Sequence, residues 1–208
     1  MRVYKFLNST FALKSLSEKR LKISTLDDLN DPFELIPYDL SNRTHRIAVQ
    51  MTRETMSRGH GMLCFSADWR DPVLWAHYAD KHRGVCIGFE IRDEVAKKVA
   101  YVSERLPFPE SPEMKDSEAM LFTKYANWAY EEEIRVFAEL NDQENRLYFR
   151  EFDETFYPVC VIAGARCELA KSEIEKALGD LAATVRLVKA RAGFGKFEIV
   201  EDLRGFRR

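Results

Sequence analysis

The chain has 208 residues, the length of about one ordinary domain. Hydrophobic residues make up 46% of it and charged residues 32%, and 32 Lys and Arg stand against 34 Asp and Glu, a formal net charge of -2. The charge balance disfavours a dedicated nucleic-acid-binding protein, because such proteins usually carry a basic excess, and the aromatic content disfavours a disordered acidic tail. The composition is rich in aromatic residues, at 12%. We therefore expect a single globular domain over residues 1–208.

No segment of the sequence predicts export or membrane insertion. The N-terminal Met-Arg-Val-Tyr-Lys is followed by no apolar stretch of signal-peptide length, and the longest apolar run, 159–165, is too short to span a bilayer. We therefore expect a cytoplasmic protein that does not bind membranes. Its four cysteines stand among apolar residues without a C-x-x-C pair, so we expect buried thiols and no metal site.

Apolar periodicity and capping residues predict an α+β fold, with a mixed, mainly antiparallel sheet flanked by helices. Asp71-Pro72 is a helix start, because Asp caps the first turn and Pro fits its first position, and Gly84 is expected to end that helix. Ser172 and Glu175 have the spacing of a capping box. The predicted strands are 4–7, 21–25, 62–66, 85–89, 134–140, 157–163, 184–188 and 197–200. The predicted helices are a first one capped by Ser9 or Thr10, the segments 44–58, 71–82 and 120–128, and a last one that opens at Ser172.

Three segments contain more Trp, His, Tyr, Asn and charged residues than core packing requires. The first, 29–34, contains Asn-Asp-Pro, which by itself predicts a tight turn with Phe33 in the core. Alternatively, this turn lies beside a pocket and offers Asn30 and Asp31 as hydrogen-bonding groups for a ligand.

The second segment runs from Trp75 to Gly84, on the predicted helix. One interpretation makes Trp75 and Tyr78 core aromatics and His77 an ordinary surface residue. The other makes the segment the wall of a ligand site, where Trp75 and Tyr78 stack on a flat ring and His77 donates a hydrogen bond. A metal site is not expected, because His77 and His82 are five residues apart and do not share a helix face.

The third segment, 124–135, reads Lys-x-x-x-Trp-x-Tyr-Glu-Glu-Glu-Ile-Arg. If the chain is extended from Glu131 onward, a period of two places Glu131, Glu133 and Arg135 on one face, with the two carboxylates about 6.6–6.8 Å apart. Such a row can be a solvated salt-bridge ladder that contributes little to stability. It can also be a carboxylate pair at a cleft, held ionised by Arg135 and able to stabilise a cationic sugar transition state.

Together these segments resemble a bacterial family described as domain of unknown function 2971. The resemblance covers about 3–165, and the segment 172–200 completes the domain. The family description implies no activity. The motifs that carry the resemblance are Leu-Asn-Asp-Pro-Phe-Glu at 29–34, Cys-Phe-Ser at 64–66, Trp-Ala-His-Tyr-Ala-Asp-x-His-x-Gly-Val-Cys-Ile-Gly-Phe at 75–89 and Trp-x-Tyr-Glu-x-Glu-x-Arg at 128–135.

More distantly, the order of elements is similar to that of the ADP-ribosyltransferase superfamily, with a short first strand, an early helix, a Phe-Ser strand and a late Glu-x-Glu strand. This resemblance implies that Glu133 is the catalytic acid and Glu131 its companion. It also implies that Ser66 matches the serine of the middle strand, and that Tyr4 or Lys5 takes the first-strand position. The Arg or His usual in that first strand is absent, and no G-x-G-x-x-G loop occurs.

Two main functional hypotheses follow. In the first, the protein is an NAD-consuming enzyme, an ADP-ribosyltransferase or NAD glycohydrolase acting in phage defence or as a toxin, with NAD as substrate and no other cofactor predicted. In the second, it is a non-catalytic module that binds a nucleotide or a protein through Trp75 and Tyr78. A nucleic-acid enzyme is a third possibility, based on the basic segment 189–196 and on Arg204, Arg207 and Arg208, but the overall charge disfavours it.

Overall fold

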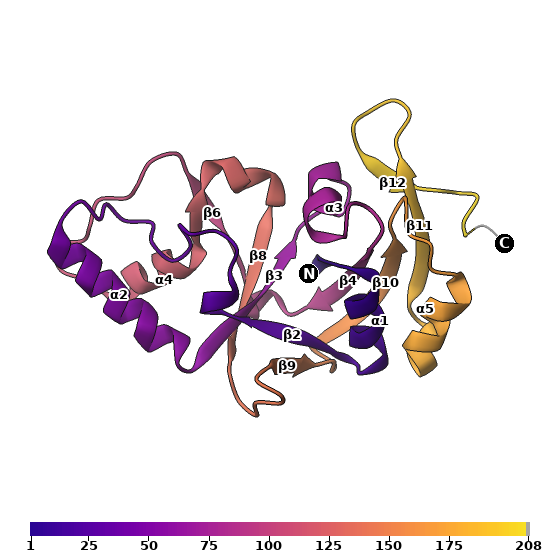
Figure 1. Cartoon of the computed structure of the whole chain (residues 1–208), viewed down its shortest axis with the longest axis horizontal. Coiled ribbons are helices and arrows are strands. Elements are labelled where there is room, and N and C mark those ends of the chain that lie inside the picture. Colours follow the sequence, from indigo (N-terminus) through magenta and orange to yellow (C-terminus); the bar gives the residue numbers. More distant parts are fainter. Residues whose placement is uncertain (207–208) are drawn as a thin grey trace. The chain divides into compact units, whose positions relative to one another are not determined.

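A computed structural model describes residues 1–206, and in it the chain divides into two compact units (Figure 1). Each unit is assembled from segments that lie far apart in the sequence. The fold is α+β with a mixed, mainly antiparallel sheet, which confirms the predicted class. Arg207 and Arg208 lie outside the described residues. Unit 1 consists of Met1–Leu21, Phe65–Asp93 and Phe149–Arg208, and unit 2 consists of Lys22–Cys64 and Glu94–Tyr148.

Unit 1 contains five neighbouring strands in the order β12-β11-β10-β4-β1. Neighbours run antiparallel except β10 and β11, which are parallel. Next to β1 lies Ser66, the last residue of β3 (His60–Ser66), which is the register partner of Tyr4. The strand β9, Tyr148–Glu151, pairs with the start of β2. The other bounds are β1 Arg2–Leu7, β4 Val85–Ile91, β10 Phe156–Ala163, β11 Arg186–Ala192 and β12 Ile199–Glu201.

The helices of unit 1 are α1 (Ser9–Ser17), α3 (Pro72–Tyr78), α5 (Lys171–Leu178) and the short 3-10 helix η4 (Gly179–Ala183). α1 packs against α5 and β4, and α3 packs against β1 (Figure 1). The Asp71 carboxylate accepts the backbone N–H groups of Val73 and Leu74, so the predicted start of α3 is confirmed. α1 is capped by Asn8, whose side chain accepts the N–H of Phe11, and not by Ser9 or Thr10.

The predicted signal for the end of α3 is wrong. After α3 the left-handed conformation is taken by Asp80, Lys81 and His82, whereas Gly84 has no positive φ. Gly84 is required for space instead, because a Cβ there would overlap the carbonyl oxygen of Leu7.

The start of α5 also differs from the predicted capping box. The Glu173 carboxylate accepts the backbone N–H of Ala170 at 2.8 Å, so the box is closed by Glu173 rather than by Ser172 and Glu175. The prediction placed the helix start two residues too far along the chain.

Unit 2 contains the strand order β2-β3-β8-β5 and a separate parallel pair, β6 and β7. The pairs β2–β3 and β5–β8 are antiparallel. The short strands of three residues were not predicted, because such a length shows no periodicity. The bounds are β2 Arg20–Thr25, β3 His60–Ser66, β5 Ala96–Lys98, β6 Ala100–Val102, β7 Thr123–Tyr125 and β8 Glu133–Glu139.

Two helices, α2 (Arg43–Ser57) and α4 (Met114–Phe122), cover the apolar interior of unit 2. Val49 of α2 and Met120 of α4 pack together with Tyr38, and Leu121 of α4 packs with Met62 of β3. Short 3-10 helices are η1 (Leu26–Asp28), η2 (Asp93–Val95) and η3 (Ala126–Glu131).

The helix predicted for 120–128 is wrong. α4 ends at Phe122, and the chain then becomes extended as β7, where it pairs with β6, before η3 begins. Tertiary pairing therefore overrides the local helical pattern. Among residues 1–206, no helix is both long enough and apolar enough to cross a membrane.

Candidate functional site

Five charged side chains of unit 2 form a buried group, which we call the ion cluster: Glu34, Lys124, Glu131, Glu133 and Arg135. Their exposed fractions lie between 0% for Arg135 and 6% for Lys124 and Glu133. Charged residues of these types are almost never fully buried unless they are paired. Each of these five buried charges therefore needs an oppositely charged or hydrogen-bonding partner within the ion cluster.

Arg135, on β8, connects two of the carboxylates. Its Nε donates to Glu133 Oε1 at 2.8 Å and its Nη2 to Glu133 Oε2 at 2.9 Å. Nη2 also lies within hydrogen-bond distance of both Glu34 oxygens, at 2.8 and 2.9 Å. Nη1 donates to the carbonyl oxygen of Leu121, near the end of α4, at 2.6 Å. The guanidinium thus holds together β8, α4 and the segment that contains Glu34.

Lys124, on β7, brings in the third carboxylate. Its Nζ lies 2.6 Å from Glu131 Oε2, 3.2 Å from Glu133 Oε2 and 3.4 Å from Glu34 Oε1. The same ammonium stands 4.7 Å from the centre of the Trp128 ring, a cation–π contact. Three carboxylates therefore share two cations, which leaves one formal negative charge if all five groups are ionised.

Burial and the neighbouring charges shift the pKa values of the acidic groups in and beside the ion cluster. Burial opposes the charge of Glu133, but Arg135 and its hydrogen bonds outweigh burial and lower the pKa of Glu133 to about 2. At Glu34 burial dominates and raises the pKa, in spite of Arg135 and Lys124. Burial also raises the pKa of Tyr101, whose hydroxyl oxygen accepts the Glu133 N–H at 2.8 Å, to about 12. At neutral pH, Glu133 is a carboxylate and Tyr101 a neutral phenol.

Glu131 and Glu133 do not share a strand face, in contrast to the sequence prediction. η3 ends at Glu131, and Glu132 adopts a left-handed conformation (φ 43°, ψ 48°) before β8 begins at Glu133. The turn brings Glu131 to Lys124 instead. Glu133 and Arg135 do contact each other along β8, but both are buried, so the interpretation as a solvated ladder is wrong.

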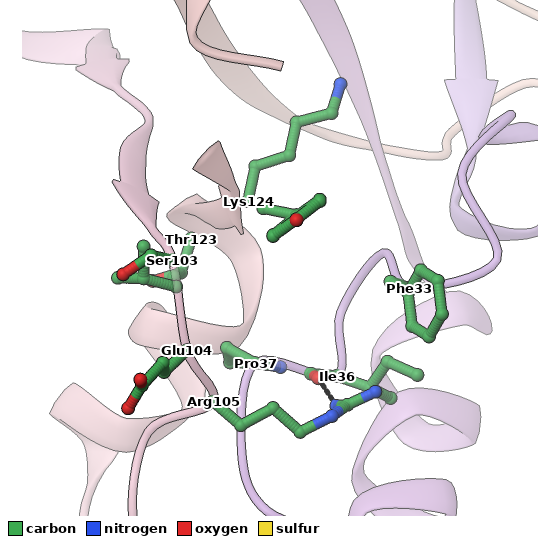
Figure 2. A pocket seen from close by; sticks show the side chains of 10 residues that line it. Phe33, Ile36, Pro37, Ser103, Glu104, Arg105, Thr123 and Lys124 are labelled. Carbon is green, nitrogen blue, oxygen red and sulfur yellow. Dashed lines mark hydrogen bonds between the residues drawn. The ribbon is translucent and has the colours of Figure 1, made fainter. Parts of the chain in front are cut away.

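A pocket of about 350 Å³ lies beside the ion cluster in unit 2 (Figure 2). Lys124 belongs to both, because it lines the pocket while its ammonium points away from Ser103, Glu104 and Arg105 and binds the carboxylates (Figure 2). Phe33 lines the pocket too, and it directly precedes Glu34 of the ion cluster. The lining residues are Phe33, Ile36, Pro37, Val102, Ser103, Glu104, Arg105, Thr123, Lys124 and Tyr125.

Arg105 and Phe33 form one wall of the pocket. Nη1 of Arg105 donates to the carbonyl oxygens of Ile36 and, at 3.0 Å, of Tyr38, and Figure 2 marks the bond to Ile36. The guanidinium lies 5.4 Å from the centre of the Phe33 ring, which is 57% exposed. The wall therefore presents an aromatic ring and a fixed positive charge side by side.

Asn30 and Asp31 form the predicted turn just before Phe33. Oδ1 of Asp31 accepts the N–H of Phe33 at 2.9 Å, whereas its Oδ2 is buried and has no hydrogen-bond partner among the described residues. Asn30 is exposed. The turn is confirmed. The turn interpretation also placed Phe33 in the core, and this part is wrong, because the ring is exposed.

The remaining predicted ligand residues belong to unit 1: Tyr4, Lys5, Ser66, Trp75, His77 and Tyr78. Tyr4 and Ser66 are neighbours across β1 and β3. The Ser66 hydroxyl is engaged locally, since it donates to the carbonyl oxygen of Asp68 at 2.8 Å and accepts the Asp68 N–H at 3.2 Å. The Lys5 ammonium lies 5.9 Å from the centre of the Phe65 ring.

Trp75 is a core residue in this structure. It is fully buried, its Nε1 donates to the carbonyl oxygen of Trp69 at 2.6 Å, and its ring meets Phe6 edge to face at 5.2 Å. A ring without exposed surface offers no face on which a ligand could stack. His77 is exposed and Tyr78 half-buried, so these two remain accessible.

Sequence reasoning missed Glu34, Lys124 and Arg105. Glu34 and Lys124 both lie in the segments that the sequence singled out, at 29–34 and 124–135, so their charge within an aromatic-rich segment was an available signal. Arg105 precedes the proline-rich stretch 107–112 and has no comparable signal.

Comparisons with family models, with curated proteins and with solved structures found no match to this chain. Within the described part of the chain, no group of three or more His, Cys, Asp or Glu side chains is arranged to hold a metal ion.

Proposed function

We propose that the pocket of unit 2 binds a nucleotide, with NAD as the first candidate. One observation carries the proposal: the exposed Phe33 ring and the Arg105 guanidinium stand together on one pocket wall. A base or nicotinamide ring can stack on an aromatic face, and a phosphate accepts charge-assisted hydrogen bonds from a guanidinium. A volume of about 350 Å³ is at the lower end of the range for small-molecule sites.

The fixed geometry of Arg105 favours an anionic group in the ligand. Its guanidinium bonds the two carbonyl oxygens through Nη1 alone. Nε and Nη2 make no hydrogen bond to any residue of 1–206, which leaves them for two parallel bonds to a phosphate. The resemblance to ADP-ribosyltransferases supports NAD as the nucleotide to test first.

Titration calorimetry with NAD, ADP-ribose and AMP tests the binding. Replacing Arg105 with Ala is expected to weaken the affinity about tenfold or more, because it removes a charge-assisted contact. The matched control is Arg58→Ala, at an exposed arginine that does not line the pocket. Absence of binding of all three ligands, or the same loss in both variants, would contradict the proposal.

A second candidate is cleavage of the nicotinamide–ribose bond of NAD, with Glu133 as the catalytic carboxylate and Glu131 as its companion. Neither carboxylate lines the pocket itself, but the ionised state of Glu133 and its contact with Lys124, which does line it, favour this candidate. Nicotinamide would leave with the bonding electron pair, and water or an acceptor nucleophile would add to the cationic ribose, whose charge a fixed carboxylate stabilises. NAD loss would then account for a role as a toxin or in phage defence.

Chromatographic detection of nicotinamide separates the two candidates. An enzyme releases nicotinamide from NAD, and Glu133→Gln abolishes the release while Glu139→Gln, on the same strand but exposed, does not. Circular dichroism tests whether both variants fold. If Glu133→Gln does not fold, Glu131→Gln takes its place in the assay. Binding of NAD without nicotinamide release leaves the non-catalytic binding module as the function.

A further inference from the structure

The segment that joins β11 and β12 in unit 1 carries two exposed aromatic side chains at its tip. It extends beyond the strands it connects (Figure 1). Phe194 exposes 91% of its surface and Phe197 102%. Gly195 stands between them in the sequence, and a Cβ built there would meet no atom within 4 Å. We call residues 191–197 the aromatic tip. Two phenylalanines that are almost fully exposed, three residues apart on one loop, add apolar surface of the kind that marks interaction sites.

Positive charge accompanies these rings. The Arg191 guanidinium lies 4.3 Å from the centre of the Phe194 ring. Lys196, between the two aromatic residues, is exposed and forms no ion pair with another residue of 1–206. The surrounding sequence is basic as well: residues 186–208 contain seven Lys and Arg but three Asp and Glu, and of these Arg186 and Arg204 are ion-paired with Glu201 and Asp202. The net charge of -2 for the whole chain conceals this local excess.

We infer that the aromatic tip binds single-stranded nucleic acid. Bases stack on Phe194 and Phe197, and the phosphates between them contact Arg191 and Lys196. Every base has a flat face, so this mode of binding tolerates any sequence, and it combines the aromatic platform and positive charge typical of single-strand binding. The inference does not depend on the nucleotide pocket, which belongs to unit 2.

The position of the charges favours nucleic acid over a membrane surface. Deep insertion of both rings among lipid chains would bring the Arg191 guanidinium, which lies against Phe194, toward the apolar region unless the side chain reaches back to the headgroups. Stacking of bases leaves both cations in water, beside the phosphates. Base stacking therefore needs no rearrangement of these two cations, whereas deep insertion into a membrane does.

Fluorescence anisotropy with labelled 12-nucleotide oligo(dT) and oligo(U) in 50 mM salt tests this inference on the full chain. The double variant Phe194→Ala/Phe197→Ala is expected to bind at least about tenfold more weakly, because base–aromatic stacking is lost. Phe11→Ala, at a 59% exposed phenylalanine of α1 in the same unit, is the matched control and retains full affinity. Thermal unfolding verifies that removing these exposed rings leaves the fold intact.

Salt dependence supplies a second measurement. Two phosphate contacts predict that a plot of the logarithm of the affinity against the logarithm of the salt concentration has a slope of about -1.4. Lys196→Ala removes one contact and should reduce the magnitude of this slope by about 0.7. No oligonucleotide binding, equal binding of a 12-base-pair duplex, or full affinity in the double variant would overturn the inference. It would also be overturned if the double variant lost binding only to vesicles containing phosphatidylserine, since the partner would then be a membrane.

Discussion

The Arg135 guanidinium and the Glu133 carboxylate form a two-point hydrogen-bonded pair in the interior of unit 2, with Nε–Oε1 at 2.8 Å and Nη2–Oε2 at 2.9 Å. Both side chains are almost completely removed from water. Burying two ions costs free energy that their attraction only partly offsets, so such a pair need not add net stability. Loss of one partner is different, because it leaves a buried charge without compensation.

We expect Arg135→Met to lower the free energy of unfolding by about 3–5 kcal/mol, because Lys124 would then be the one cation left in contact with Glu133 and Glu34 among the described residues. Urea unfolding followed by circular dichroism measures the loss. The control is Arg150→Met, which removes a partly exposed ion pair with Asp153 and should cost less than about 1 kcal/mol. Similar losses in the two variants would mean that the ion cluster does not stabilise unit 2.

The acid limb of the stability profile should depend on Glu133. Its pKa of about 2 in the folded protein lies below the usual value of about 4.3 in an unfolded chain. Between these values the unfolded chain binds more protons, so the contribution of Glu133 is present above about pH 5 and is lost as the pH falls toward 2. The loss should be roughly 3 kcal/mol. Unfolding in urea from pH 2 to 7 should therefore give a shallower acid limb for Glu133→Gln, and an unchanged limb for Glu139→Gln.

Glu34 should have the opposite pH dependence. Burial raises the pKa of Glu34 in the folded protein, so its favourable contribution is present at low pH and is lost as the pH rises through the folded value. Gln at this position keeps an oxygen acceptor for Arg135 and removes the unbalanced charge. The stability of Glu34→Gln relative to the unmodified protein should therefore increase between pH 4 and pH 9 in urea unfolding. A difference that is constant across this range would show that Glu34 does not take up the extra proton.

Local rules predicted much of the fold. The strands at β1, β4 and β10, the start of α3 at Asp71 and the extent of α2 all follow from residues close in sequence. The errors share a different cause. The chain after Phe122 becomes extended because it pairs with β6, more than 20 residues earlier, and Gly84 is required by the carbonyl oxygen of Leu7, far away in sequence. Such long-range contacts leave no local pattern.

The same distinction applies to the candidate site. Glu133 and Arg135 are two residues apart on one strand, so period two brings them together and the sequence predicted their contact. Glu34 reaches Arg135 from 101 positions away, and Lys124 meets Glu131 at the end of η3, just before the left-handed Glu132. The burial of the ion cluster depends on these partners and could not be derived from the spacing of the third segment alone.

Trp75→Phe tests whether Trp75 belongs to the core or to a ligand site. We expect a loss of about 2 kcal/mol in unfolding free energy, because the variant removes the hydrogen bond to the Trp69 carbonyl oxygen and leaves a cavity at a fully buried position. Nucleotide affinity measured by calorimetry should not change, since the ring exposes no surface and does not line the pocket. Trp69→Phe is the matched control: it keeps the backbone carbonyl that Trp75 uses, and Trp69 is only half-buried, so its loss should be smaller. If Trp75→Phe instead abolished nucleotide binding without lowering stability, Trp75 would be a ligand-binding residue after all.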